Sequence, residues 1–526
     1  MVRGAWGAVI GSLASLAVCG ASQAPAMRAA PRVAGTTSAG PTSAAPRTSS
    51  TDRVRSSRAQ AGPVQLRLDP HWRITHRGPD HAIEGWADHT SVRPGERVGL
   101  HVSTTAATWE VTAYRMGWYG AVGGALVWHR AGLRGTRQPP ARHDGPTSTV
   151  RTQWPTSLLL PTGQWPPGAY LLRLDSPSGQ RFVPLTVRSP ETAGRVVLVD
   201  GVTTWQAYNA WGGYSLYQGP AGKADFAHRS TAVSFDRPYD GDGSGQLLTL
   251  DLPTIAHAER LGVPLAYVTD IDLHMDPTVL VGARAVVTLA HDEYWSSAMR
   301  LAVTRARDTG VNVAFLGANA VFRHIRLART RYGPDRLEVN YKRLNDPLVG
   351  VDDAEVTTDW REPPVPRPES ELTGVFYECN PVDAPLVVTD PGSWLFAGTG
   401  AGAGLRLPHL VGPEYDRVNP GVPTPRRIEV LSHSPVRCRG VPSFSDSAWY
   451  DVPSGAGVFA SGSNWFARGL PEAGATGVTA RVVGGMLSNL LLAFAAGPAG
   501  AAHPAQPNLA GLHEYAGDPV AAASGQ

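Results

Sequence analysis

The sequence predicts an α/β protein in which an antiparallel β-sandwich precedes a larger domain with a parallel sheet. Short alternating segments, separated by glycine and proline, fill residues 63–190 and are typical of a sandwich. From residue 196 onward, fully apolar segments alternate with segments of helical periodicity, which indicates buried parallel strands joined by helices. The chain has 526 residues, of which 42% are hydrophobic and 17% charged, so it can bury more than one core.

The first residues have the pattern of an export signal. Arg3 precedes an apolar segment over residues 5–18, and small residues follow up to residue 24. We therefore predict that residues 1–24 are a signal peptide and that the protein is exported. The apolar segment is too short to span a membrane. Because Leu16-Ala17-Val18-Cys19 also resembles a lipoprotein box, plain secretion and membrane attachment through a lipid on Cys19 are both open.

Two stretches lack the large apolar side chains that a folded core needs. Residues 25–62 consist mostly of Ala, Ser, Thr, Pro and Arg, and residues 506–526 are rich in Ala, Pro and Gly, so we predict a disordered linker and a disordered tail. The formal net charge is only +3 and no basic stripe is visible. Nucleic acid is therefore not an expected partner.

Residues 63–190 are predicted to form an immunoglobulin-like sandwich. Its clearest strands are expected at residues 98–102, 109–114, 169–174 and 182–187. Turn sequences such as Arg93-Pro94-Gly95 separate these segments, as antiparallel strands require. The sequence Arg-Met-Gly-Trp-Tyr-Gly at residues 115–120 is interpreted as an aromatic loop that packs on the next domain or touches substrate.

Residues 191–505 are predicted to form the α/β domain. Its expected elements are strands at 196–199 and 265–269, a helix at 250–260, an acidic turn at 270–274, a β-rich insertion after residue 326, and an apolar helix at 479–496. The central part, residues 283–326, predicts a βαβ unit. Its first strand ends at a polar turn, Ser296 is the expected helix N-cap, and its second strand ends at Gly317-Ala318-Asn319.

The cysteine content predicts one disulfide. Only three cysteines occur in the chain, and an exported mature chain would keep Cys379 and Cys438. An oxidising compartment favours a bond between these two, because no other mature cysteine competes. Two buried free thiols are the alternative.

Polar side chains follow the strands of the βαβ unit, at the edge where open parallel sheets bind their ligands. The turn His291-Asp292-Glu293-Tyr294 holds no Ser or Cys nucleophile, and the usual hydrolase, zinc-protease and nucleotide motifs do not occur where they would matter. Carboxylates, imidazoles and phenols suit acid/base catalysis or a hard, oxygen-preferring cation. The alternative is that these residues only cap the helix and bind backbone groups.

The candidate site residues come from this edge and from loops that can reach it. The catalytic candidates are His291, Glu293 and Asn319, and the substrate-binding candidates are Trp205, Tyr208 and Asn209. Asp270 and Asp272 are further titratable groups at the same edge. Tyr294, Glu378 and Glu414 can join them if the insertion folds over the site.

Several motifs together resemble the C-terminal family of the N,N-dimethylformamidase large (beta) subunit. They read HDEYWS, GANAVFRHIR, VTDIDLH, YRMGWYG, GVFYECNPV and GSNWF, and the likeness extends from about residue 83 to about residue 505. The resemblance implies a glutamine-amidotransferase-like α/β domain without its cysteine nucleophile. It also implies a mononuclear iron held by two tyrosinates and a glutamate, which activates water for attack on a small amide.

Carried over to this chain, the resemblance implies Tyr294 and Glu378 as iron ligands, with Tyr208 or Tyr267 as the second tyrosine. The function predicted on this basis is that of an exported hydrolase of C–N (amide) bonds acting on a small-molecule or cell-envelope substrate. The alternative is a non-catalytic cell-envelope or carbohydrate-binding protein on the same fold. Bound iron, or a convergent set of two tyrosines and a glutamate, supports the enzyme, whereas a shallow aromatic groove without clustered titratable groups supports the binding protein.

Residues 25–62 have too little apolar surface to contribute to folding. We therefore expect a chain that begins near Pro63 to unfold at the same temperature as a chain that begins after the signal peptide. Thermal unfolding of the two chains, followed by circular dichroism, measures this. A midpoint several degrees lower for the shorter chain would contradict the expectation.

Overall fold

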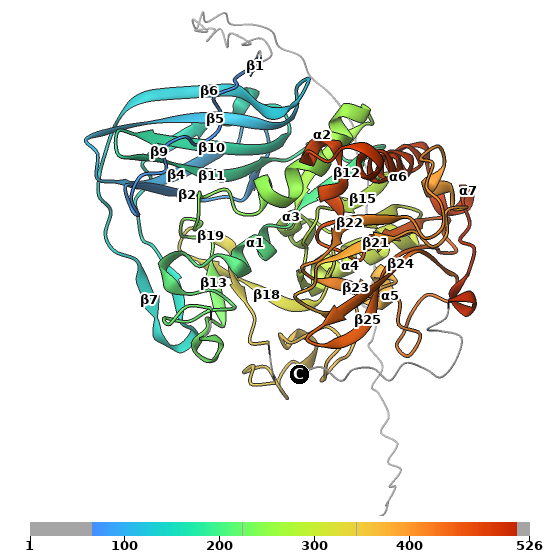
Figure 1. The fold of residues 1–526 in the computed structure, drawn as a ribbon. Coiled ribbons are helices and arrows are strands. Elements are labelled where there is room, and N and C mark those ends of the chain that lie inside the picture. Colours follow the sequence, from blue (N-terminus) through green and yellow to red (C-terminus); the bar gives the residue numbers. More distant parts are fainter. Residues whose placement is uncertain (1–65, 224, 343, 513–526) are drawn as a thin grey trace, which may run out of the picture. The chain divides into compact units, whose positions relative to one another are not determined.

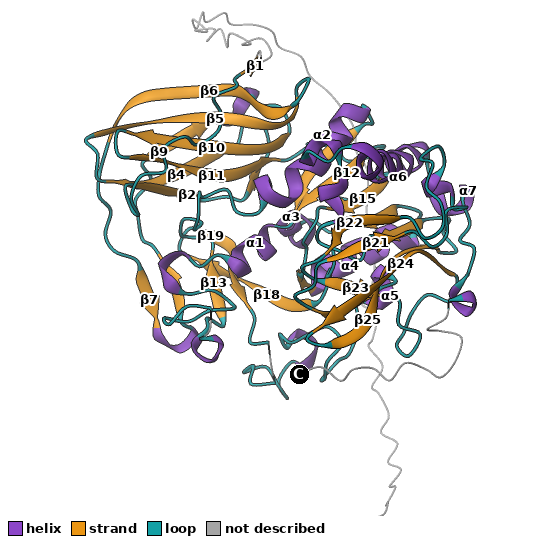
Figure 2. Ribbon diagram, viewed as in Figure 1, coloured by secondary structure: helices purple, strands orange, loops and turns teal. Residues whose placement is uncertain are grey.

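The computed structural model describes residues 66–223, 225–342 and 344–512, which show a mixed α/β fold (Figure 2). These residues belong to a single compact unit. The predicted signal peptide and linker lie outside the described residues, as does most of the predicted tail. The mixed α/β class expected from the sequence is confirmed.

A sheet of seven strands forms the centre of the α/β part. In spatial order the strands are β14 (Leu265–Thr269), β12 (Val196–Asp200), β15 (Ala285–Thr288), β17 (Asn312–Phe315), β26 (Gly457–Ala460), β25 (Val441–Asp451) and β24 (Ile428–Cys438). The first five run parallel, and the last two join antiparallel. All residues of β12, β15, β17 and β26 are buried, as expected for strands covered on both faces.

The α-helices of the described residues are α1 (Val202–Tyr208), α2 (Leu252–Leu261), α3 (Asp270–Met275), α4 (Ser297–Asp308), α5 (Ser370–Thr373), α6 (Gly477–Ala496) and α7 (Ala499–Ala502). Helices α3 to α7 contact strands of this sheet. Helix α6 is long and apolar enough to cross a membrane by length and composition. Its Leu487, Leu490 and Phe494 are buried in the core, and it lies beside α2 (Figure 1), so it is a core helix of this fold.

The predicted βαβ unit is confirmed as β15, α4 and β17, with β15 and β17 paired in parallel. The Ser296 hydroxyl oxygen accepts a hydrogen bond from the Met299 backbone N–H at 3.3 Å, so the predicted N-cap is also confirmed. The acidic segment after β14 is helix α3 rather than a turn. Thr269 and Asp272 form a reciprocal capping box there, a signal for a helix start that the sequence interpretation missed.

An antiparallel sandwich precedes the α/β part. One sheet contains β1 (Arg67–Leu68), β6 (Val122–Arg134), β5 (Thr108–Trp118), β10 (Gly168–Ser176), β11 (Gly179–Val187) and the short parallel edge strand β3 (Ser91–Val92). The other contains β2 (Ile83–Ala87), β4 (Arg97–Thr104) and β9 (Leu158–Pro161). Successive side chains of β10 belong to two different cores. Leu172 packs inside the sandwich, whereas Leu171 belongs to the cluster around the central sheet.

Residues 115–120 do not form the expected loop, because they continue β5 as far as Trp118. Their expected packing on a neighbouring element is observed. Arg115 forms an ion pair with Glu259 of α2 at 2.7 Å, and the Trp118 backbone N–H donates to the same carboxylate at 2.7 Å. A Cβ atom at Gly117 would lie 2.0 Å from the Glu259 carboxylate, so only glycine permits this approach.

The remaining strands form smaller sheets, several of whose strands lie after residue 326, where the sequence predicts a β-rich insertion. The four-stranded sheet contains β13 (Ala232–Ser234), β19 (Gly333–Val339), β18 (Arg323–Thr330) and β16 (Tyr294–Ser296). The two-stranded sheets pair β20 (Phe376–Cys379) with β23 (Tyr415–Arg417), β21 (Ala384–Val387) with β22 (Arg406–Val411), and β7 (Arg142–Asp144) with β8 (Thr149–Arg151). The predicted Cys379–Cys438 disulfide is present and joins the ends of β20 and β24, with the Cα atoms 6.3 Å apart.

Arg336 ties the four-stranded sheet to the sandwich. Its guanidinium pairs with the buried Asp236 carboxylate at 2.6 Å and donates to the Ala87 carbonyl at 3.0 Å. Arg336→Met would leave Asp236 as an unpaired buried charge, so we expect a loss of about 3–5 kcal/mol in the free energy of unfolding. Denaturant unfolding measures this. The exposed Arg329 of β18 is the control, since Arg329→Met should change that free energy by less than about 0.5 kcal/mol.

Candidate active site

The candidate site lies where the parallel strands end. Helix α1 follows β12 and carries Tyr208 at its last position, and residues 291–293 follow β15. Residue Asn319 comes after β17, with a left-handed backbone conformation of φ 59°. The sheet topology therefore brings three separate segments to one edge, as the sequence predicted.

Three tyrosine hydroxyls and one carboxylate form the centre of the site, which we call the phenol cluster: Tyr208, Tyr217, Tyr294 and Glu293. The hydroxyls of Tyr208 and Tyr217 each donate to the Glu293 carboxylate at 2.7 Å. The Tyr294 hydroxyl donates to the Tyr217 oxygen at 2.7 Å. The rings of Tyr208 and Tyr217 stack with centroids 4.4 Å apart, which aligns their hydroxyls toward Glu293.

Two basic side chains border the phenol cluster. The Arg323 Nε lies 3.3 Å from the Glu293 carboxylate, and the same guanidinium pairs with Asp359. The Lys342 Nζ lies 3.2 Å from the centroid of the Tyr217 ring. Lys342 is buried, and its Nζ has no hydrogen-bond partner within the described ranges. Its backbone is left-handed, with φ 60°, which is strained for a side chain of this kind.

Burial controls the protonation of the phenol cluster. Burial and the neighbouring Glu293 raise the pKa of Tyr208, Tyr217 and Tyr294 well above the usual value. Burial and, to a smaller extent, the positive charge of Arg323 lower the pKa of Lys342 well below its usual value. Without a bound cation the phenols are therefore protonated donors at neutral pH.

An ion pair between His291 and Glu414 adjoins the phenol cluster. The His291 Nε2 lies 3.0 Å from the Glu414 carboxylate and 3.5 Å from that of Glu293. Although burial opposes both shifts, mutual attraction lowers the pKa of Glu414 and raises the pKa of His291. Hydrogen bonds from Asn464 and Asn319 also lower the pKa of Glu414. A buried, charged acid/base pair results.

The structure brings together most of the residues that the sequence singled out for this edge. His291, Glu293, Asn319, Tyr208 and Tyr294 gather there, and the insertion supplies Glu414. Asp272 caps helix α3, and Asp270 accepts hydrogen bonds from the Thr203 backbone N–H and hydroxyl. The alternative interpretation, in which such residues cap helices and bind backbone groups, therefore describes both Asp270 and Asp272.

Four other predicted residues make their contacts elsewhere. Trp205 belongs to the hydrophobic core. The Asn209 side chain donates to the Pro238 carbonyl and accepts from the Trp211 and Asp240 backbone N–H groups. Glu378 pairs with Arg417 at 2.6 Å, and the Tyr267 hydroxyl donates to Glu259 at 2.6 Å. The carboxylate that joins the tyrosines is thus Glu293, and Tyr217 is the second tyrosine that contacts it.

Sequence reasoning missed Tyr217, Lys342 and Arg323. Tyr217 follows the substrate-binding candidate Asn209 by only eight residues, so extending that candidate segment to the next tyrosines would have included it. Arg323 is the first residue of β18, and Lys342 follows the end of β19. Arg323 lies within the GANAVFRHIR motif, but nothing local in the sequence marks it or Lys342 as buried, because their contacts depend on how distant segments pack at the sheet edge.

The fold and the site together define a mixed α/β protein with a buried centre of phenols and carboxylates at the carboxyl edge of a parallel sheet. The sequence profile of the family described as N,N-dimethylformamidase beta subunit-like, C-terminal, matches residues 110–478. This match covers well over half of the chain, so the protein belongs to that family. Comparison with curated proteins gives no match.

Lys342 carries a stability cost that depends on pH. The pKa of Lys342 in the folded state is well below the usual value. Between that pKa and the unfolded-state pKa of about 10.4, the unfolded state therefore binds more protons than the folded state. Stability must therefore rise with pH in that interval. We expect Lys342→Met to increase the free energy of unfolding at about pH 7, and to increase it less at about pH 10.

Urea unfolding at the two pH values measures this difference. The exposed Lys223 is the matched control, since Lys223→Met should leave the free energy of unfolding nearly unchanged at both. A loss of stability in Lys342→Met at neutral pH would show that the ammonium group is stabilised in the folded state.

Proposed function

We propose that the protein hydrolyses the C–N bond of an amide with the help of a mononuclear iron held by Tyr208, Tyr217 and Glu293. The observation that carries the proposal is the convergence of both phenol hydroxyls on the Glu293 carboxylate at 2.7 Å. Membership of the N,N-dimethylformamidase beta subunit-like family supports the reaction class.

The chemistry of the phenol cluster fits such a metal. All its donors are oxygen atoms, which suit hard cations. Within the described ranges, His, Cys, Asp and Glu by themselves form no group of three that could hold a metal, so phenols are needed to complete a ligand set. A bound cation would favour the phenolate forms and reverse the shift that burial imposes on the pKa values. Tyr294 would then support Tyr217 through its hydrogen bond.

Iron in this position would act as a Lewis acid and bring water to the amide carbonyl. The protein groups beside it have separate tasks. Glu414, which His291 holds ionised, accepts a proton from the attacking water. His291 lies between the carboxylates of Glu414 and Glu293 and passes the proton on to the leaving amine. The buried walls around them limit competing water.

The proposal extends to fold type and location. We infer a glutamine-amidotransferase-like type for the α/β part, supported by its parallel sheet order and by a strand-to-helix turn without a nucleophile. We also infer export, with secretion or a lipid on Cys19 as the two routes. The Cys379–Cys438 disulfide supports export, because such bonds persist in oxidising compartments.

A surface pocket favours a second candidate function, which is the binding of a carbohydrate or cell-envelope ligand. The pocket has a volume of about 440 Å³ and is lined by Trp211 and Tyr239 together with charged residues such as Glu84 and Arg181. Aromatic faces beside hydrogen-bonding groups suit sugar rings. Under this alternative, the phenol cluster would be a structural hydrogen-bond network.

Metal content and colour decide between the two functions. We expect the protein purified with iron supplied to contain about one iron per chain and to absorb visible light by charge transfer from tyrosinate. Tyr217→Phe and Tyr208→Phe should lose both properties while remaining folded. Tyr294→Phe should weaken iron binding by about 10–100-fold. Tyr214→Phe is the control, because Tyr214 lies in the same loop but packs on His143.

Hydrolysis of small amides such as N,N-dimethylformamide should follow the metal content across these variants. A colourless and metal-free wild-type protein, purified with iron supplied, would overturn the iron proposal. Binding of oligosaccharides by that protein would then support the second function.

A further inference from the structure

Glu414 is held in place by elements that lie outside the central sheet. It immediately precedes β23, whose Tyr415 is the register partner of Cys379 in β20. Asn380 immediately follows β20. The short pair of β20 and β23 therefore places Asn380 and Glu414 next to each other, although they are far apart in the sequence.

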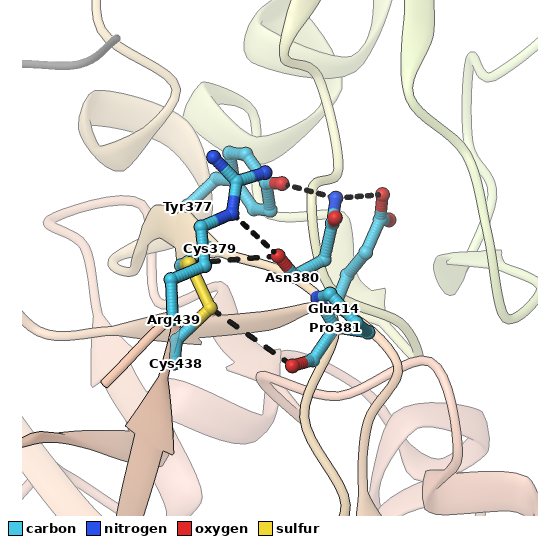
Figure 3. Close-up of a disulfide and its surroundings, with 7 residues drawn as sticks. All are labelled: Tyr377, Cys379, Asn380, Pro381, Glu414, Cys438 and Arg439. Atoms are coloured by element: carbon cyan, nitrogen blue, oxygen red, sulfur yellow. Dashed lines mark hydrogen bonds between the residues drawn. A yellow bond between two sulfur atoms is a disulfide. The ribbon is translucent and has the colours of Figure 1, made fainter. Parts of the chain in front are cut away.

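Each oxygen of the Glu414 carboxylate has an amide donor, and the Asn319 side chain is a further hydrogen-bond partner of this carboxylate. The Asn464 Nδ2 donates to Oε2 at 2.8 Å, on the side where His291 also lies, and the Asn380 Nδ2 donates to Oε1 at 3.3 Å. The same Asn380 amide donates to the Tyr377 hydroxyl at 2.7 Å (Figure 3). A carboxylate with both oxygens engaged cannot rotate freely, so the Asn380 contact on Oε1 adds to the contacts of Asn464, Asn319 and His291 that hold its orientation.

The disulfide anchors Asn380. Cys379 is its neighbour in the chain, and the Arg439 Nε, next to Cys438, donates to the Asn380 carbonyl at 3.2 Å (Figure 3). A two-stranded sheet such as that of β20 and β23 is marginally stable by itself. The disulfide connects β20 to β24, which belongs to the seven-stranded sheet. The position of Asn380 thus depends on a covalent tie to the core of the protein.

We propose that Asn380 is a positioning residue for Glu414, and that the Cys379–Cys438 disulfide acts on the site through Asn380. The catalytic consequence rests on the proposed function, in which Glu414 accepts the proton from water. The structural consequence does not, because it concerns only where the carboxylate lies. Small displacements of a catalytic group reduce turnover by up to about 100-fold, so loss of one of several contacts should lower kcat by about 10-fold and leave KM nearly unchanged.

A double-mutant cycle in the full-length protein tests this coupling. Its members are Asn380→Ala, the pair Cys379→Ser with Cys438→Ser, and the triple variant. The readouts are kcat and the NMR signal of the Asn464 side-chain amide, in protein made with isotope-labelled asparagine and without metal. The signal reports on Glu414 independently of activity, since that amide donates to the Glu414 carboxylate.

We expect Asn380→Ala and the double serine variant each to shift the Asn464 signal and to lower kcat. The triple variant should show the same signal shift and the same kcat as Asn380→Ala. Asn380→Gln, which keeps an amide donor, should recover part of the signal and of kcat. Asn489→Ala is the matched control, since that amide binds the Leu395 and Ala397 carbonyls away from the site, and it should change neither readout.

Three outcomes would overturn the proposal: an unchanged Asn464 signal in Asn380→Ala, the same kcat in Asn380→Ala and wild type, or fully additive effects of the two changes. If the wild type hydrolyses no amide, the proposed function fails, and the Asn464 signal still decides the role of Asn380. If the double serine variant does not fold, Asn380→Ala and Asn380→Gln decide it with the disulfide intact. An unshifted signal in the first, or no recovery in the second, would then overturn the proposal.

Discussion

The buried carboxylate of Glu293 is the constraint on which the site depends. Glu293 has no solvent exposure, and a buried carboxylate must be satisfied by donors and charges because its desolvation is costly. Its partners come from separate segments: Tyr208 from the end of α1, Tyr217 from the following loop, and Arg323 from the start of β18. The partners of this one carboxylate therefore hold the loop after β12 and the four-stranded sheet against the same edge.

The second half of the site depends on the insertion in a different way. Glu414 reaches His291 from a two-stranded sheet that a disulfide connects to the central sheet. The central sheet thus supplies His291 and Glu293, and the insertion supplies the group that charges His291. Neither half has the buried His291–Glu414 ion pair without the other.

Much of the fold could be predicted from local patterns. The run at 265–269 forms β14 with the expected bounds, Ser296 caps α4, and Cys379 pairs with Cys438. Two expectations were wrong. The acidic segment after β14 is a helix, which the capping box of Thr269 and Asp272 starts, and β5 continues to Trp118 because it pairs with β6 over that stretch. The strand ends predicted that His291, Glu293 and Asn319 lie at one edge. They did not predict which of the surrounding tyrosines and carboxylates contact one another there.

The sequence by itself determined the elements and the edge, because hydrophobic periodicity, helix caps and strand ends are properties of neighbouring residues. It also determined the disulfide, since only two cysteines remain after the predicted signal peptide. Only the tertiary structure decided that Tyr217 joins Tyr208 on Glu293, that Glu378 pairs with Arg417, and that Lys342 lies over the Tyr217 ring. These contacts join residues far apart in the chain, and they depend on which side chains must share the desolvated space around one buried charge.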